Sequence, residues 1–156
     1  MENELEKRYE MLVEEYSDMV TRLTLVHTGN FSDAEDCYQT VFFKLFKALQ
    51  GNKAPPNPKA WLLKVTVNEC RSLLRYRLGR STVSLEEITV LSNDKRDHEM
   101  LDLIYRLSPK NRDAIYLYYY EGLSIQEIAA VTKTKENTVK SQLKRGREKL
   151  KELLEE

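Results

Sequence analysis

The feature that most constrains the fold is the stretch from Leu123 to Leu150, which predicts a short helix, a tight turn and a second, basic helix. Ser124 and Glu127 have the S-x-x-E spacing of a capping box, in which each side chain can hydrogen-bond a free backbone N–H at a helix start. The turn falls at residues 132–135. A short helix, a turn and a basic helix in this order fit the major groove of DNA. The stretch therefore indicates recognition of nucleic acid rather than catalysis.

The second helix of this stretch has two different faces. Val139, Leu143, Gly146 and Leu150 follow spacings of four, three and four residues, which places them on one side of a helix. Basic and amide groups occupy the opposite side and one flank, and Gln142 is expected on the other flank. The residues expected to face DNA are Asn137, Lys140, Ser141, Lys144, Arg145 and Arg147.

The rest of the chain predicts an all-α protein of two small domains. The sequence has few glycines and prolines and little alternation of β-branched residues. Helical periodicity covers residues 5–28, about 32–49, about 59–78, near 98–107, and 109–121. Ser32 is the expected N-cap of the second helix, and Ser108 with Pro109 begins the last. Residues 79–97 are polar and weakly periodic, so we predict helical domains at 1–78 and 98–156 joined by a flexible linker at 79–97.

Charge is distributed in blocks, although the formal net charge of the 156 residues is zero. Residues 51–80 carry a net charge of +6 and residues 132–151 also carry +6, against an acidic background that includes −5 over residues 1–50. Screening over about 8 Å in physiological salt makes these local blocks more important than the total. The two basic blocks are expected to contact DNA, and the acidic N-terminal third is expected to contact protein.

Few residues are available for metal or redox chemistry. Cys37 and Cys70 are far apart in sequence and fall on apolar helical faces, so we expect buried, reduced thiols. The only histidines are His27 and His98, and no metal-ligand cluster, nucleophile–base pair or glycine-rich phosphate loop is visible. We therefore expect no metal, no cofactor and no enzymatic activity. The sequence has no signal peptide and no apolar run of membrane-spanning length, which predicts a cytoplasmic protein without membrane insertion.

Phe43 departs from the pattern of its helix. The apolar residues between positions 33 and 49 cluster on one side, whereas Phe43 points away from them, among Asp36, Gln39 and Thr40. An exposed aromatic ring surrounded by polar groups is typical of a protein-docking site. Burial of the ring under another segment, such as the N-terminal helix, is the alternative, and the periodicity does not decide between the two.

The helix that begins near Trp61 carries a basic stripe. Lys64, Asn68, Arg71 and Arg75 lie about 90° from its buried side, Trp61 borders them, and Arg77 and Arg80 extend the positive charge. Basic side chains position phosphates, asparagine can hydrogen-bond a base edge, and aromatic rings can stack on unpaired bases. A solvated basic face beside a core tryptophan is the alternative. The second basic helix in the same chain favours nucleic-acid binding.

Taken together, three stretches resemble a known family. They are DAEDCYQTVFFKLFKAL, AWLLKVTVNECRSLLR and LSPKNRDAIYLYYYEGLSIQEIAAVTKTKENTVKSQLKRGREKL. In this order and spacing they are similar to the extracytoplasmic-function (ECF) sigma factors, the small two-domain group of the sigma-70 superfamily. The resemblance covers nearly the whole chain apart from the linker and the extreme ends.

The resemblance implies a role for each basic or exposed face. Asp33, Asp36, Gln39 and Phe42 match the segment that docks on the clamp helices of the largest RNA polymerase subunit, and the exposed set Asp36, Gln39, Thr40 and Phe43 would form that contact. Trp61 and Asn68, with the stripe of Lys64, Arg71 and Arg75, match the segment that recognises and opens the −10 promoter element. Residues 51–59 match the loop that holds a flipped base. Lys140, Ser141, Lys144 and Arg145 match the helix that reads the −35 element.

The implied partners are core RNA polymerase, including the flap of the second-largest subunit, promoter DNA and an anti-sigma factor. This chain departs from the family pattern at Thr40, where an acidic residue is usual, and at Lys133, Gln142 and Gly146, where glycine, arginine and alanine are common. Two other functions stay open: a stand-alone DNA-binding regulator that shares the C-terminal module, and a sigma-like accessory activator. The first would bind DNA specifically without polymerase and usually as a dimer on a palindrome.

Overall fold

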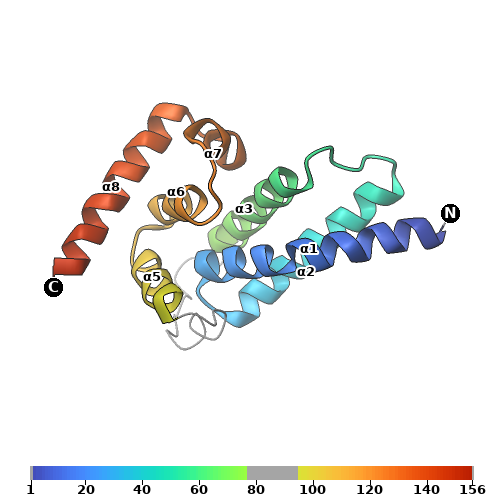
Figure 1. Cartoon of the computed structure of the whole chain (residues 1–156), viewed down its shortest axis with the longest axis horizontal. Coiled ribbons are helices and arrows are strands. Elements are labelled where there is room, and N and C mark those ends of the chain that lie inside the picture. The colour runs from blue at the N-terminus through green and yellow to red at the C-terminus, as the bar shows by residue number, and fades with distance from the viewer. Residues whose placement is uncertain (1, 77–94, 156) are drawn as a thin grey trace.

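The computed structural model describes residues 2–76 and 95–155, and all of its regular elements there are α-helices, which confirms the all-α prediction (Figure 1). In chain order they are α1 (Glu2–Thr28), α2 (Phe31–Gln50), α3 (Pro58–Tyr76), α5 (Lys95–Tyr105), α6 (Pro109–Tyr119), α7 (Ile125–Thr132) and α8 (Glu136–Glu155). Helices α1, α2 and α3 pack on one another and form the N-terminal half. Helices α5 to α8 form the C-terminal half, in which α6 and α7 both pack on α8.

The predicted helix boundaries need two corrections. Asn30 caps α2 in place of Ser32: its side-chain oxygen accepts a hydrogen bond from the backbone N–H of Asp33 at 2.8 Å. Gly29 adopts a φ of +76°, which ends α1 and lets α2 begin two residues later. Helix α5 begins at Lys95, three residues before the predicted start near 98. The predicted linker lies mostly outside the described residues, as do Arg77 and Arg80.

A continuous apolar core joins the two halves. The same cluster contains almost completely buried residues of both halves: Leu23, Leu45 and Leu62 from the N-terminal half, and Ile115 and Leu143 from the C-terminal half. Across the boundary α3 packs on α7, and α1 packs on α5 and α6. Because burial of one such side chain stabilises a fold by about 1.5–3 kcal/mol, this contact holds α3 close to α6 and α7.

Cys37 and Cys70 are both free and buried, as expected from the sequence. A hydrogen bond to Cys37 and complete burial hold the pKa of the Cys70 thiol well above its ordinary value. Such a thiol is protonated at neutral pH and is therefore a poor nucleophile. None of the described helices is both long enough and apolar enough to cross a membrane.

Candidate nucleic-acid interface

The predicted capping box and turn before α8 are present. The backbone N–H of Glu127 donates to Ser124 Oγ at 3.1 Å, and the backbone N–H of Ser124 donates to Glu127 Oε1 at 3.0 Å. These bonds with Ser124 hold the pKa of the Glu127 carboxyl below its ordinary value. Helix α7 ends at Thr132, and the residue that caps it, Lys133, is left-handed with a φ of 55° and a ψ of 44°. Residues 123–150 therefore form the expected helix, turn and helix.

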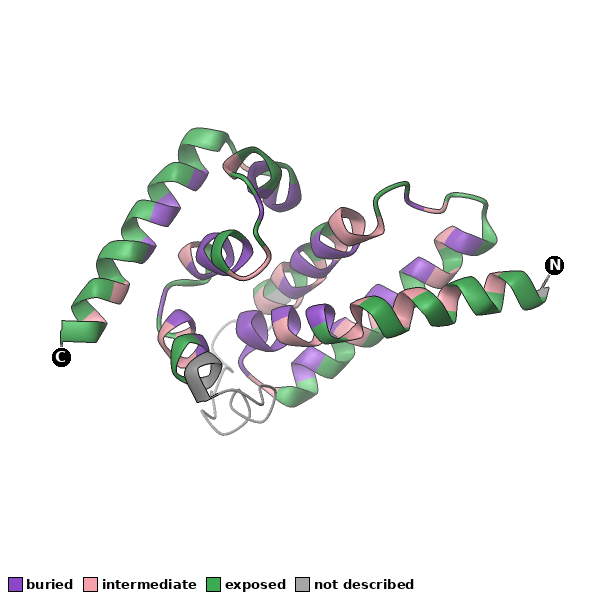
Figure 2. Ribbon diagram, in the orientation of Figure 1, coloured by how far each residue is buried: buried purple, intermediate pink, exposed green. Residues whose placement is uncertain are grey.

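Helix α8 separates a buried side from an exposed side, as predicted (Figure 2). Val139, Leu143 and Gly146 face the other C-terminal helices. Gln142, expected on a flank, is instead only 3% exposed, so it belongs to the inner side. We call the following exposed residues the α8 face: Asn137, Lys140, Ser141, Lys144, Arg145 and Arg147.

Within the α8 face, only two side chains have a partner in the described part of the protein. Ser141 Oγ donates to the Asn137 carbonyl at 3.1 Å, and an Nη1 of Arg147 donates to the Tyr119 hydroxyl at 3.3 Å. Lys140, Lys144 and Arg145 extend into solvent without such a bond. Three unpaired cations on one helix surface, beside an amide and a hydroxyl, can contact phosphates and base edges.

We give the name α3 stripe to five residues of α3: Trp61, Lys64, Asn68, Arg71 and Arg75. They lie in different environments. Lys64, Asn68 and Arg75 are exposed, as nucleic-acid contact requires. Trp61 is half-buried and packs against the apolar core, so only part of its ring is available for stacking. Arg71 is also half-buried and is occupied by partners from α6 and α7. The structure thus leaves three of the five stripe residues open to solvent.

Arg71 belongs to a polar cluster between the two halves. One guanidinium nitrogen, Nη2, lies 3.3 Å from Asp113 Oδ2, and Nη1 donates to the Thr132 carbonyl at 2.9 Å. The other carboxylate oxygen of Asp113 lies 2.6 Å from His27 Nδ1. The Asp113 side chain is only 1% exposed, so these partners satisfy the hydrogen-bonding groups that burial removes from water.

Arg112 connects the same surfaces through backbone groups. Its Nη1 donates to the carbonyls of Val26 and His27 at 3.1 and 3.0 Å, and its Nη2 donates to the Leu107 carbonyl at 3.1 Å. The guanidinium also lies 4.2 Å from the centre of the Tyr105 ring. Burial lowers the pKa of Arg112, while Tyr105 and Asp113 favour the charged form. Arg112 thereby joins α6 to the carboxyl end of α1.

The structure decides between the two interpretations of Phe43, because the ring is 57% exposed. No described segment covers it, and Lys47 lies 5.0 Å from the ring centre on the same helix. Asp36 and Gln39 are exposed and Thr40 is half-buried, with Thr40 Oγ1 bonded to the Asp36 carbonyl at 3.0 Å. We call these four residues, Asp36, Gln39, Thr40 and Phe43, the α2 face. They form a polar surface around an exposed aromatic ring, which suits protein rather than DNA.

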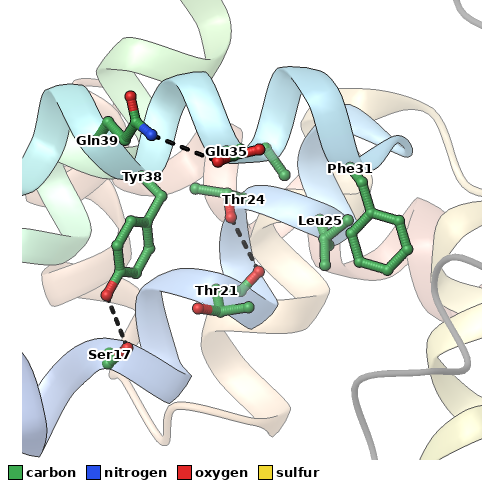
Figure 3. A pocket seen from close by; sticks show the side chains of 9 residues that line it. Ser17, Thr21, Thr24, Leu25, Phe31, Glu35, Tyr38 and Gln39 are labelled. Carbon is green, nitrogen blue, oxygen red and sulfur yellow. Dashed lines mark hydrogen bonds between the residues drawn. The ribbon is translucent and has the colours of Figure 1, made fainter.

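A hollow of about 410 Å³ between α1 and α2 adjoins this face (Figure 3). Gln39 of the α2 face lines it and donates to Glu35 Oε1 at 3.4 Å. Across the hollow, the hydroxyls of Ser17 and Tyr38 are 2.8 Å apart and tie α1 to α2 (Figure 3). The Phe31 ring, 41% exposed, stands at one end. The α2 face is therefore hollowed on its α1 side.

A larger groove, of about 780 Å³, lies between α5, α6 and the end of α8. Exposed apolar side chains line it: Met100 is 40% exposed, Tyr119 54% and Leu154 68%. Arg147 and Lys151 add positive charge. This groove is on the C-terminal half, and sequence periodicity did not indicate it because its walls come from three separate helices.

Two acidic residues that face α3 were not predicted from the sequence. Asp113 and Glu121 are eight residues apart on or just after α6, and their side chains are only 1% and 6% exposed. Glu121 Oε2 lies 3.7 Å from Lys59 Nζ, and Lys59 also donates to the Glu121 carbonyl at 3.3 Å. The available signal was a pair of acids eight residues apart, one on the apolar and aromatic second half of α6 and one just after it.

Two family models match the chain in succession. The model described as Sigma-70 region 2 matches residues 12–79, and the model described as Sigma-70, region 4 matches residues 97–150. The α2 face and the α3 stripe fall in the first match, and the α8 face falls in the second. The order of the two regions agrees with the order predicted from the sequence.

Curated relatives and solved structures agree with these matches. The ECF RNA polymerase sigma factor SigE of Mycolicibacterium smegmatis is 31% identical over 94% of this chain, which spans 61% of that relative's length. The sigma factor SigV of Bacillus subtilis is 29% identical over 80% of this chain and 78% of its own. The sigma factor RpoE of Bartonella quintana, solved in complex with the anti-sigma factor NepR, has the same fold. Its structural alignment with this protein has a TM-score of 0.79 and a sequence identity of 24%. The alignment covers 96% of this chain and 98% of the RpoE chain.

Proposed function

Because the chain belongs to the ECF sigma factors of the sigma-70 family, which are not enzymes, we propose that it brings core RNA polymerase to promoters by reading two DNA elements. The observation that carries this proposal is the presence of two exposed basic surfaces, the α3 stripe and the α8 face, on different halves of one chain. A protein that recognised a single DNA element would need only one such basic surface. We assign polymerase binding and the −10 element to residues 1–78, and the −35 element to residues 98–156.

At the −10 element, Lys64 and Arg75 would hold phosphates, and Asn68 would hydrogen-bond a base. Opening the duplex costs a few kcal/mol for each unstacked base. Stacking of a base on an aromatic ring returns about 1–3 kcal/mol, and the free part of the Trp61 ring can supply such a contact. The loop before α3, residues 51–57, would hold a flipped base.

At the −35 element, α8 would enter the major groove with its exposed side toward DNA. Asn137 at the amino end and Ser141 one turn later can reach base edges, while Lys140, Lys144, Arg145 and Arg147 can contact phosphates. Holding both elements on one polymerase-bound chain makes the second contact intramolecular. Two DNA contacts that are weak separately then bind strongly together, because the first contact raises the effective concentration for the second.

For polymerase, we assign the α2 face to the clamp helices of the largest subunit. Exposure of Phe43 among Asp36 and Gln39 supports this assignment, because an exposed aromatic ring surrounded by polar side chains suits a protein partner. We assign the apolar groove between α5, α6 and α8 to the flap of the second-largest subunit. An anti-sigma factor that covered either surface would compete with polymerase. Such a role places the protein in the cytoplasm.

The test is run-off transcription with purified core polymerase and a library of promoter fragments. We expect the chain to select fragments with a shared −10 and −35 sequence, and Asn68→Ala to change the base preference at −10. An unchanged −10 preference would remove Asn68 from base reading. Failure of the wild-type chain to select any promoter would overturn the proposed function.

The rival function, a stand-alone DNA-binding regulator, has a different signature. It predicts tight, specific binding in a gel shift at moderate salt without polymerase, usually as a dimer. The exposed Phe43 and the second basic surface on α3 favour the sigma-factor function over this rival. The same run-off assay distinguishes a sigma-like accessory activator. Such an activator would not start transcription with core polymerase alone, because it needs a separate sigma factor.

A further inference from the structure

A hollow of about 560 Å³ lies where α1, α3 and α6 meet. Its charged and polar lining comes from all three helices: His27, Arg71, Arg75, Lys110 and Asp113. Sites that take small molecules have volumes of about 300–1,000 Å³ and combine apolar walls with a few polar groups. The hollow is therefore large enough for a small ligand.

One polar atom of the histidine that lines this hollow has no partner. His27 is only 2% exposed, and its Nδ1 lies 2.6 Å from Asp113 Oδ1. The other ring nitrogen, Nε2, is buried, and no described residue hydrogen-bonds to it. Buried polar groups nearly always have a hydrogen-bond partner, so this nitrogen indicates a group that binds beside it. Because Asp113 accepts from Nδ1–H, Nε2 accepts a hydrogen bond in the neutral ring and donates one in the charged ring.

The charged groups of the hollow are mainly cationic. Three of them are Arg71, Arg75 and Lys110, and Asp113 offsets one, so the net charge is +2 when the ring of His27 is neutral. Arg71 is occupied by bonds within the protein, but Arg75 and Lys110 are exposed. Among the described residues, Arg75 bonds only the Arg71 carbonyl, through Nε at 3.5 Å, and the Lys110 ammonium has no partner. Two cations are therefore available to an anion in the hollow.

The amino end of α6 adds to the positive potential. Pro109 and Lys110, in the first turn of this helix, both line the hollow. Ser108 makes no side-chain bond at this end, and the first turn carries no acidic residue. Helix N-termini bind phosphate and other anions through free backbone N–H groups and the helix dipole. A positive helix end, two available cations and a buried ring nitrogen thus belong to one hollow.

We propose that this hollow binds a small molecule with a terminal phosphate group. The second pKa of such a group is about 6, so near neutral pH it can bring the proton that the neutral His27 ring accepts at Nε2, or leave that proton on the ring. Its other oxygens suit Arg75, Lys110 and the amino end of α6. Leu74 and Pro109 offer apolar surface to the rest of the ligand, which favours a nucleoside phosphate over free phosphate.

The first test locates the ligand by nuclear magnetic resonance of the full chain labelled with ¹⁵N-histidine. His98→Gln leaves the signals of His27 alone, because the chain has two histidines. Adenosine diphosphate should shift the His27 Nε2 signal in a saturable way, and inorganic phosphate should do so at higher concentration. Sulfate at equal ionic strength should bind roughly tenfold more weakly than phosphate, because it cannot carry the shared proton and one hydrogen bond is lost. Adenosine should leave the signal unchanged.

The second test measures the affinity for adenosine diphosphate by calorimetry. His27→Asn keeps an amide near the position of Nδ1 for Asp113 but has no group at Nε2, so binding should weaken roughly tenfold. Lys110→Met removes an exposed cation and should weaken binding roughly threefold. Lys149→Met is the matched control and should leave the affinity unchanged, because Lys149 is an exposed lysine of α8 that pairs with Glu152 at 3.5 Å and does not line the hollow.

The absence of a saturable shift with adenosine diphosphate would overturn the proposal, and so would equal shifts with sulfate and phosphate, which would mean a general attraction of anions. An equal shift with an oligonucleotide that lacks terminal phosphates would also overturn it, because the hollow would then accept the DNA backbone. If His27→Asn loses helical circular dichroism, Lys110→Met decides, and wild-type affinity in that variant counts against the site. Neither test contains polymerase or a promoter, so run-off transcription tests the proposed function separately.

Discussion

Lys133 holds a backbone conformation that residues with a Cβ atom avoid. Its φ of 55° and ψ of 44° close α7 in the left-handed region, where glycine is the usual residue. Lys133→Gly should therefore raise the free energy of unfolding by roughly 1 kcal/mol, measured by urea denaturation. Lys133→Ala is the matched control, because it removes the same charge but keeps the Cβ atom. An equal gain from alanine would show that charge, and not backbone strain, sets the cost.

Lys144 tests the α8 face at the scale of one charge. It is exposed on the side opposite Val139 and Leu143, so we expect it to contact phosphate. Lys144→Ala should weaken binding to a −35 duplex and reduce the slope of log affinity against log salt by about 1. Lys149→Ala, a loss of the same charge from a residue paired with Glu152, should leave the slope nearly unchanged. An unchanged slope for Lys144→Ala would remove Lys144 from the phosphate contacts.

At the scale of elements, α8 and α6 approach each other closely because position 146 has no side chain. A Cβ atom on Gly146 would lie 2.5 Å from Ile115 Cγ1, and Ile115 is only 1% exposed. Gly146→Ala should therefore destabilise the protein by about 1 kcal/mol, since overpacking of about 1–3 kcal/mol exceeds the helix-propensity gain of about 1 kcal/mol.

The sign of this change should reverse once Ile115 is shortened. In an Ile115→Ala background, which leaves a cavity at this contact, Gly146→Ala should stabilise the protein in urea denaturation. Destabilisation in both backgrounds would mean that the helix contact does not explain the glycine. The result would also separate a packing requirement from simple sequence drift at position 146.

Features that depend on the local sequence of one helix were predicted well. Features that depend on packing against another helix were predicted less well. The capping box of Ser124 and the inner side of α8 follow from local hydrogen bonding and from helical period. Gln142 was misplaced because burial at a flank depends on the neighbouring helices. Asn30 replaced Ser32 as N-cap because Gly29 fixes where the chain turns. The environment of Arg71 was not predictable, since Asp113 and Thr132 are 42 and 61 residues away.

At the scale of the whole molecule, the contact between the halves should make the chain unfold as one unit. Trp61, the only tryptophan, lies on α3 in the N-terminal half, whereas far-ultraviolet circular dichroism reports helices of both halves. Because Arg112 and Asp113 join α6 to α1 and α3, the urea transitions seen by Trp61 fluorescence and by circular dichroism should coincide.

Arg112→Met keeps a long side chain but removes the donors to Val26 and His27, so the two transitions should separate. The expected effect is on coupling rather than on total stability, because an apolar residue in place of a buried charge is often neutral or stabilising. Arg106→Met, which removes a half-exposed arginine paired with Asp102 of its own half, should leave the transitions coincident. Transitions that already differ in the wild type would mean that the two halves are not coupled in the free chain.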